Sequence, residues 1–331
     1  MQIDVFSMPT RQELEEYVQS MFGRVKNVSL ISGKNNTGTY VFRLDETDED
    51  TGRAKQGSLL LKINIPLRHI SASRRKKYSD LFQKEIDITS HLGIFHKDFY
   101  PKVHSAGIRG VNKNREKPAT VKHGKFPEET YFMLVEYLKG TGLDKVIEEN
   151  NLSFDNKVDI ALHITYGLNR LHNVEGITHQ DIKPENIILD EKNKPRIIDL
   201  ETADYALEKV PLCRAGILTP IYCSPEQAEQ IITGVPVHVN DPRTDIFSFG
   251  LLLYELFSGK HIYEEAISKL TFTSNLLRYF MSRPPHKIET TGNPDIDNIV
   301  YRATRAKDER YSNMEHVISD LEKVKPKLIM F

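Results

Sequence analysis

The chain has 331 residues, of which 39% are hydrophobic, so it is long enough for one large domain or two ordinary ones and is not expected to be disordered. Lys plus Arg (45) nearly balance Asp plus Glu (46), and the net charge of −1 argues against a dedicated nucleic-acid or anionic-membrane binder. Two cysteines make a poor disulfide framework, and the sequence shows no secretory leader or membrane-spanning apolar stretch, so we expect a cytoplasmic protein.

The first sixty-five residues predict one helix followed by strands. Thr10 and Glu13 form a capping box, and apolar residues recur at helical spacing, so we expect an amphipathic helix over residues 10–22. This helix is interpreted as an extension packed on the domain, with a role in docking partners as the alternative. Strands are expected over residues 28–33, 40–44 and 58–65, and the first two flank a turn rich in Gly and Asn between Gly33 and Gly38.

Lys62 lies in the middle of the third predicted strand, among leucine and isoleucine residues. A buried ammonium group is costly unless it is paired with an anion, whereas a Lys on the outer face of a strand can reach solvent. A helix expected over residues 82–92 carries Glu85 on its inner side, and Asp87 is the competing acid. A pairing of Lys62 with Glu85 is therefore our prediction.

Further along, the pattern changes from strands to helices. Residues 108–127 are polar, basic and rich in turn formers, which predicts a long solvated loop. Residues 131–140 begin as a buried strand and run into a linker, after which strand signals stop. A helix capped by Ser153 follows, so we place a boundary near residue 139.

The stretch from His179 to Asn186 places an Asp, a Lys and an Asn in one short loop. Two short apolar runs follow, residues 187–189 and 196–198, on either side of a polar stretch that ends in Pro, so we expect a hairpin. Such a hairpin brings Asn186 and Asp199 together, and two oxygen ligands there suit Mg²⁺. Asp181 would then lie beside the metal and could orient a hydroxyl.

The motif His179-Gln-Asp-Ile-Lys-Pro-Glu-Asn186 resembles the catalytic loop of eukaryotic-type Ser/Thr protein kinases, and Asp199-Leu-Glu stands where that family has Asp-Phe-Gly. Other segments similar to the family appear in the family's order over about residues 25–325. They are Lys62, Glu85, the strand and linker at 131–140, the segment ending Thr219-Pro-Ile-Tyr-Cys-Ser224-Pro-Glu226 with Ser224 in place of Ala, Asp245, and Arg310, which the resemblance pairs with Glu226. For Asp245, capping of its own helix is the alternative explanation.

The resemblance implies an α+β, two-lobed protein-kinase-like fold. It assigns residues 25–138 to a small β-rich N-lobe and residues 139–327 to a larger helical C-lobe. Residues 1–24 remain as an N-terminal helical extension and residues 328–331 as a tail.

The resemblance also implies a site for ATP, Mg²⁺ and a protein substrate. Asp181 would accept the proton of the substrate hydroxyl, Lys183 would contact the γ-phosphate, and the Thr219 hydroxyl would bridge these two residues. Lys62 would contact the α- and β-phosphates and be held by Glu85. The remaining expected contacts are Asn186 and Asp199 to Mg²⁺, and Gly33, Gly38, Val135, Glu136 and Leu138 to the nucleotide.

Three departures from the family pattern stand out. Gln180 replaces the Arg that grips a phosphate on the activation segment in many members, and Glu201 replaces a Gly that is free to adopt positive φ. The turn between Gly33 and Gly38 also lacks the family's three-glycine pattern. Because the residues expected to touch phosphate, metal and hydroxyl are all retained, we expect an active Ser/Thr kinase.

Two alternatives stay open: a pseudokinase that serves as a nucleotide-binding scaffold, and a small-molecule phosphotransferase. Autophosphorylation, if it occurs in the activation segment, has Thr202, Thr219 and Ser224 as candidates. We expect no nucleic-acid partner and no membrane association, and the sequence leaves the oligomeric state unknown.

Overall fold

The computed structural model of the chain describes residues 9–22, 27–34, 38–47, 54–65, 71–111, 116–117, 121, 124, 126–205, 220–234, 241–269, 275, 277–279 and 289–325. The chain divides into two compact units. The first unit contains residues 1–97 and 101–138, and the second contains residues 98–100 and 139–331.

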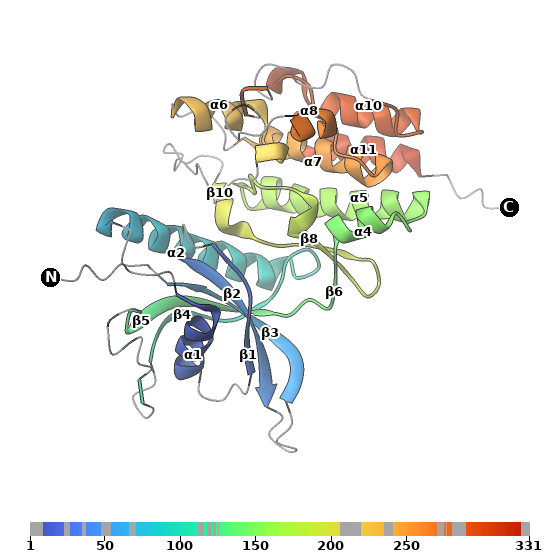
Figure 1. The fold of residues 1–331 in the computed structure, drawn as a ribbon. Coiled ribbons are helices and arrows are strands. Elements are labelled where there is room, and N and C mark those ends of the chain that lie inside the picture. Colours follow the sequence, from blue (N-terminus) through green and yellow to red (C-terminus); the bar gives the residue numbers. More distant parts are fainter. Residues whose placement is uncertain are drawn as a thin grey trace. The chain divides into compact units, whose positions relative to one another are not determined.

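The first unit is built on a five-stranded antiparallel sheet in the order β1-β2-β3-β5-β4 (Figure 1). The strands are β1 (Asn27–Lys34), β2 (Thr39–Thr47), β3 (Ala54–Asn64), β4 (Val103–Gly110) and β5 (Glu129–Glu136). Side chains alternate along β2, where Tyr40, Phe42 and Leu44 are buried, so one face of the sheet forms a hydrophobic core. The predicted strands are therefore present, each somewhat longer than predicted.

Helix α1 (Arg11–Met21) is part of the core of this unit. Its capping box forms as predicted, since the Thr10 side chain accepts from the Glu13 backbone and the Glu13 side chain accepts from the Thr10 backbone. Its apolar face lies in the same core as β2 and β3, and Glu15 Oε1 accepts a hydrogen bond of 2.9 Å from the backbone N–H of Leu30 in β1. The helix thus packs on the sheet as expected, and Figure 1 shows it beside β1.

The prediction of a solvated loop over residues 108–127 is wrong at several of the positions that the structure describes, although Glu116 is exposed. Residues 108–110 complete β4, and Val111, Val121 and Phe126 are buried in the core of the first unit. The Phe126 ring stacks on the Tyr17 ring at 4.6 Å, and the Tyr17 hydroxyl donates to the Pro127 carbonyl. These apolar residues are scattered among polar ones, so they produced no periodic signal.

Helix α2 (Ala72–Phe95) is longer than predicted because Ser71 caps it, accepting from the Arg74 backbone N–H. The basic run 74–77 therefore lies inside the helix rather than before it. Phe82 and Ile86 on its buried side pack against Met133 and Val135 of β5. This packing directs the inner face of α2 toward the sheet.

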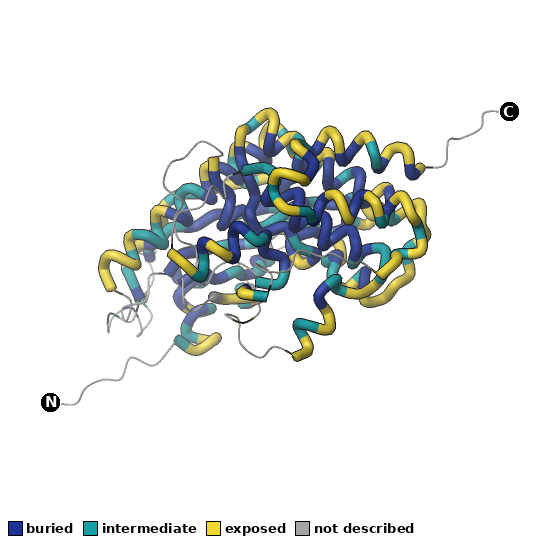
Figure 2. The backbone as a smooth tube through the Cα atoms, turned by 90° about the horizontal axis from the view of Figure 1, so that it is seen from above, coloured by how far each residue is buried: buried dark blue, intermediate teal, exposed yellow. Residues whose placement is uncertain are grey.

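The second unit is mainly helical. Its main helices are α4 (Leu143–Glu149), α5 (Phe154–Asn169), α6 (Pro225–Thr233), α7 (Pro242–Ser258), α8 (Glu264–Lys269), α10 (Pro294–Ala303) and α11 (Met314–Val324). Ser153 caps α5 as predicted, and α5 packs on α11 while α7 packs on α10. Along α5, α10 and α11 buried and exposed residues alternate, whereas α7 is almost wholly buried. Figure 2 colours buried residues dark blue and exposed residues yellow along the backbone.

Short strands and turns complete the second unit. Strands β6 (Gly140–Gly142), β8 (Ile187–Asp190) and β9 (Pro195–Ile197) form one small sheet, and β7 (Ile177–Thr178) pairs with β10 (Asp204–Tyr205). The hairpin β8–β9 is the one predicted from the two apolar runs. The remaining turns are η1 (Arg170–Val174), η2 (Pro184–Asn186), η3 (Leu200–Thr202), η4 (Pro220–Tyr222) and η5 (Lys307–Glu309).

None of the helices in the described part of the chain is both long and apolar enough to cross a membrane.

Candidate active site

The loop between β7 and β8 gathers three of the predicted site residues around one carboxylate. Lys183 Nζ donates to Asp181 Oδ2 at 2.8 Å, and Asn186 Nδ2 donates to the same oxygen at 3.1 Å and to the Asp181 main-chain carbonyl at 2.8 Å. Asp181 and Asn186 are buried, and Lys183 is partly buried. Because both Asn186 contacts use its amide nitrogen, its amide oxygen remains as an acceptor for another group.

The β8–β9 hairpin returns the chain to this loop. The Ile198 backbone N–H donates to the Asn186 carbonyl at 2.9 Å, which places Asp199 one residue beyond that contact. Asp199 has φ +61° and ψ +73°, in the left-handed region that a non-glycine residue adopts at a cost of about 1 kcal/mol. Positive φ therefore falls on Asp199, whereas Glu201 lies in the 3₁₀ turn η3 and needs no glycine-like freedom.

Asp245 anchors the start of the loop from helix α7. Its Oδ2 accepts from the His179 backbone N–H at 2.7 Å and faces His172 Nε2 at 2.8 Å, while its Oδ1 accepts from the Gln180 backbone N–H at 2.7 Å. Burial raises the pKa of this carboxyl, but the contacts with His172 and His179 outweigh burial and the pKa is lowered. The explanation of Asp245 as a helix cap is wrong, because Asp241 caps α7.

His172 was missed in the sequence analysis. It lies in the turn η1 after α5 and is buried against Asp245. Its only sequence signal is a single His after a helix, and a pattern of that kind does not identify its partner.

Gln180 is held through its backbone and its side chain. Its φ is +67°, its carbonyl accepts from Gln227 Nε2 at 2.8 Å, and its own Nε2 donates to Thr178 Oγ1 at 3.2 Å. The Thr178 hydroxyl in turn donates to the carbonyl of Asp204 in β10. The Gln180 side chain therefore contacts a neutral hydroxyl, that of Thr178, at the position where many kinases carry a charged Arg.

Two of the three candidate autophosphorylation residues are buried. The Thr202 hydroxyl donates to the His179 carbonyl at 2.9 Å, and Ser224 caps helix α6, where its hydroxyl accepts from the Gln227 backbone. Both hydroxyls are inaccessible to a phosphate donor in this conformation. Thr219, the third candidate and a predicted bridge to Asp181 and Lys183, lies outside the described residues.

The predicted ion pair of the first unit is formed. Lys62 Nζ lies 2.6 Å from Glu85 Oε1, and their side chains are 13% and 2% exposed. Asp87, the competing acid, is exposed on α2 and accepts from Gln83. Lys62 of strand β3 is therefore paired with Glu85, the acid on the inner face of α2 that was predicted as its partner.

Three residues expected to contact the nucleotide, Val135, Glu136 and Leu138, lie at or just beyond the end of β5. Val135 is buried against α2, and Glu136 bonds to the backbone of Lys102 through both its N–H and its carboxylate. Leu138 is the last residue of the unit and is partly buried. Residues 35–37, between Lys34 and Gly38 in the sequence, lie outside the described residues.

Gly33 and Gly38, the two glycines of the β1–β2 turn, occupy positions where a larger side chain is disfavoured. Gly38 has φ +74°, which favours Gly. At Gly33 a Cβ would lie 2.4 Å from the Tyr40 ring. Both glycines are therefore explained by the turn itself, and contact with a nucleotide remains a prediction.

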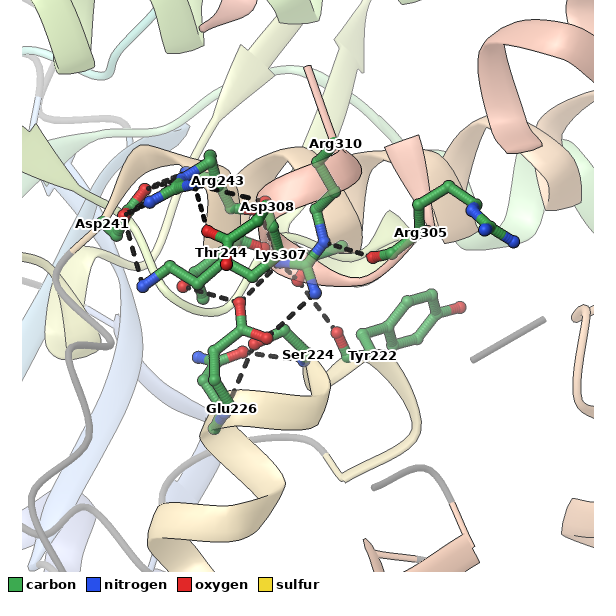
Figure 3. Close-up of polar contacts among 12 residues, drawn as sticks. Tyr222, Ser224, Glu226, Asp241, Arg243, Thr244, Arg305, Lys307, Asp308 and Arg310 are labelled. Carbon is green, nitrogen blue, oxygen red and sulfur yellow. Dashed lines mark hydrogen bonds and ion pairs between the residues drawn. The ribbon is translucent and has the colours of Figure 1, made fainter. Parts of the chain in front are cut away.

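A buried ion pair joins Arg310 to Glu226 in the first turn of α6, within the second unit. Arg310 Nη1 and Nη2 lie 2.5 and 2.9 Å from the two carboxylate oxygens of Glu226, and Figure 3 shows the guanidinium facing this carboxylate. Arg310 also donates to the carbonyls of Arg243 and Arg305, so each of its three guanidinium nitrogens makes a hydrogen bond. Burial raises the pKa of Glu226, but Arg310 outweighs burial and the pKa is lowered.

A family model described as "Protein kinase domain" matches residues 71–327, which is more than half of the chain. The chain belongs to the protein kinase family. The predicted family and the predicted α+β kinase fold, with its five-stranded sheet and its helical part, are therefore confirmed.

Several curated relatives of this kinase-family chain are bacterial. A probable serine/threonine-protein kinase of Clostridium acetobutylicum is 32% identical over 199 residues, which cover 59% of this chain and 28% of the relative. The probable serine/threonine-protein kinase PknB of Lactococcus lactis is 27% identical, covering 60% of this chain and 30% of the relative. Serine/threonine-protein kinase A of Synechocystis is also 27% identical, covering 62% and 37%. The chain thus matches well under half the length of each of these relatives.

Asp241, near the Glu226–Arg310 pair, contacts two basic side chains. It contacts Arg243 Nη2 at 2.7 Å and Lys307 Nζ at 3.2 Å, and Figure 3 includes these contacts. Burial raises the pKa of this carboxyl, but Arg243 and Lys307 lower it from 3.8 to about 2. A carboxyl whose pKa is lowered on folding stabilises the fold above its unfolded pKa, and this stabilisation is lost as the pH falls through the folded pKa.

We expect Asp241→Asn to lower the free energy of unfolding by about 2 kcal/mol at neutral pH, and by progressively less as the pH falls from about 4 toward about 2. Asn retains the N-cap acceptor, so the substitution isolates the charge. Urea unfolding at a series of pH values measures the difference. Asp308→Asn is the matched control, because Asp308 also contacts Arg243 but its side chain is 96% exposed. A difference that stays constant with pH would contradict the assignment.

Proposed function

We propose that this chain is an active protein kinase that transfers the γ-phosphate of Mg-ATP to Ser or Thr hydroxyls of protein substrates, itself included. The observation that carries the proposal is the buried Asp181 carboxylate, which is bonded to Lys183 and Asn186 in a loop anchored to Asp245. A carboxylate held in this way is suited to orient a hydroxyl and accept its proton. The names of the curated relatives support the choice of Ser and Thr.

Each retained residue has a role in this proposal. Asp181 orients the substrate hydroxyl, and Lys183, already within hydrogen-bond distance of Asp181, contacts the transferred phosphate. Lys62, oriented by its ion pair with Glu85, contacts the α- and β-phosphates. Gly33, Gly38, Val135, Glu136 and Leu138 contact the rest of the nucleotide, and Thr219 bridges Asp181 and Lys183.

Asn186 and Asp199 are the residues that would hold Mg²⁺. Two observations support this donor set. The printed contacts of Asn186 use its amide nitrogen and leave its amide oxygen as an acceptor, and the backbone N–H of Ile198, the residue before Asp199, donates to the Asn186 carbonyl. Among the described residues no group of three or more His, Cys, Asp and Glu is arranged as a metal site. Mg²⁺ commonly takes one or two protein oxygens and completes its shell with water and phosphate. When bound, the metal neutralises the charge of the phosphates.

The proposal is tested by phosphate transfer from labelled Mg-ATP to the protein itself and to a generic basic protein. We expect label on Ser or Thr with the wild type and a loss of at least about 100-fold in Asp199→Ala, which removes one of two metal ligands. Glu191→Ala is the matched control, because this exposed carboxylate lies in the turn of the same hairpin. Its activity should equal that of the wild type.

The alternative outcome identifies a nucleotide-binding scaffold. If no form of the protein transfers phosphate while ATP still raises the melting temperature, the kinase proposal is wrong and a scaffold role replaces it. Our proposal also includes a protein substrate, no nucleic-acid partner and a cytoplasmic location, where ATP is available to the enzyme.

A further inference from the structure

The carboxamide of Gln227 links the start of helix α6 to the catalytic loop. Its Oε1 accepts from the Ser224 backbone N–H at 3.0 Å, which completes a capping box with the Ser224 hydroxyl. Its Nε2 donates to the Gln180 carbonyl at 2.8 Å. Gln227 is 2% exposed and Gln180 is 5% exposed, so this bond is shielded from water. One buried amide therefore holds two segments that are far apart in the sequence.

The carbonyl that Gln227 binds belongs to a residue with an unfavourable backbone. Gln180 has φ +67°, a conformation that costs a non-glycine residue about 1 kcal/mol or more. Its N–H is fixed by Asp245 and its carbonyl by Gln227, so the peptide units on both sides of its Cα are held. The second of these peptide units leads directly into Asp181. Rotation of that unit would move the Asp181 carboxylate away from Lys183 and Asn186.

We propose that Gln227 is a positioning residue for Asp181, acting through the carbonyl of Gln180. This inference rests on the proposed kinase function. The link is neutral throughout, from Ser224 through Gln227 to Gln180 and on to Thr178, so it holds the loop without a phosphorylated residue. It makes the position of Asp181 depend on the start of α6.

The test is Gln227→Glu, which changes one group and keeps the shape. The carboxylate still accepts from the Ser224 N–H, and Glu is a favourable residue in a capping box, so α6 stays capped. The donor to Gln180 is lost and two oxygens now face each other. We expect kcat to fall by about tenfold with KM for ATP unchanged, measured well below the melting temperature.

A pH profile separates positioning from a general structural defect. The introduced carboxyl is buried beside a carbonyl, so its pKa is expected to be raised, and its protonated form can again donate to Gln180. The ratio of variant to wild-type kcat should therefore recover toward one as the pH falls. Asp181, Asp245 and Glu226 are present in both proteins, so the ratio isolates the new group.

Ser153→Ala serves as the control for loss of a helix cap. Ser153 caps α5 through the Asn156 N–H and takes no part in the link between Gln227 and Gln180, so this variant should keep wild-type kcat. A kcat of Gln227→Glu within twofold of the wild type, or a loss that does not recover at low pH, would overturn the proposal.

Amide hydrogen exchange tests the link separately from catalysis. Gln227→Glu should speed exchange in the peptide containing residues 179–182 and leave α5 unchanged. If the wild type transfers no phosphate, the proposed function fails, while this measurement still decides whether Gln227 holds the loop. Unchanged exchange at residues 179–182 would overturn the inference.

Discussion

Asp181→Asn is expected to lower kcat by about 100- to 10,000-fold, the range that a positioned general base contributes, while KM for ATP changes little. The reason lies in the geometry of the loop. Asn keeps an oxygen that can accept from Lys183, and the Asn186 bond to the main-chain carbonyl does not involve the substituted group. The loop should therefore stay in place while the group that accepts the substrate proton is lost. Steady-state transfer to a basic protein measures both constants.

Asp190→Asn is the matched control for this substitution. Asp190 lies at the end of β8 and accepts from the backbone N–H groups of Lys192 and Lys194 through one oxygen, which an Asn side chain also provides. The same chemical change in the hairpin that follows the loop should leave kcat and the melting temperature unchanged. If Asp181→Asn retains kcat within threefold of the wild type, Asp181 is not the group that accepts the proton.

Residues close together in the sequence explain why much of this site was predictable. Asp181, Lys183 and Asn186 lie in one short loop, and the turn residues between two apolar runs indicated the hairpin that returns the chain to them. Lys62 was recognisable because a cation in an apolar strand needs a partner, and Glu85 lies on the inner face of a periodic helix. These inferences depend on local patterns, which the sequence contains directly.

Contacts between distant residues were harder to predict. Nothing in the sequence near His172 indicates that it faces Asp245, because that contact depends on how α5 and α7 pack. Val121 and Phe126 were assigned to solvent because scattered apolar residues give no periodic signal, although both are buried. The early start of α2 followed from one capping serine, Ser71, in front of a basic run that does not look like a helix.

The left-handed backbone of Gln180 and Asp199 was also not predictable. Neither residue is a glycine, and each holds its conformation because tertiary hydrogen bonds fix the neighbouring groups. The sequence suggested instead that Glu201 would be the constrained position, because the family has Gly there. Conformational strain at a functional loop is decided by packing, so it becomes visible only in three dimensions.

Arg310→Met is expected to lower the free energy of unfolding by about 3–5 kcal/mol, because it leaves the Glu226 carboxylate buried without its cation. Met retains much of the volume of the side chain that lies over the Phe247 ring, so the loss reports the charge and its hydrogen bonds rather than a cavity. The carbonyls of Arg243 and Arg305 lose a donor as well. Urea unfolding at neutral pH measures the effect.

The same substitution should change how stability depends on pH. In the wild type the pKa of Glu226 is lowered, so its stabilising contribution is present above the unfolded pKa of a Glu and is lost as the pH falls. Without Arg310, burial raises this pKa, so the variant gains stability as the carboxyl becomes protonated. The deficit relative to the wild type should therefore be largest at neutral pH and shrink on acidification.

A double variant, Arg310→Met with Glu226→Gln, distinguishes loss of the pair from loss of an isolated contact. Removing the carboxylate charge removes the unpaired ion, so the double variant should be more stable than Arg310→Met alone by about 1–3 kcal/mol, a coupling typical of contacting residues. The Thr244 hydroxyl, which donates to Glu226 Oε1, can still donate to the amide oxygen. Additive losses would mean that Arg310 stabilises this part of the fold through its main-chain contacts alone, and that the buried charge pair contributes nothing of its own.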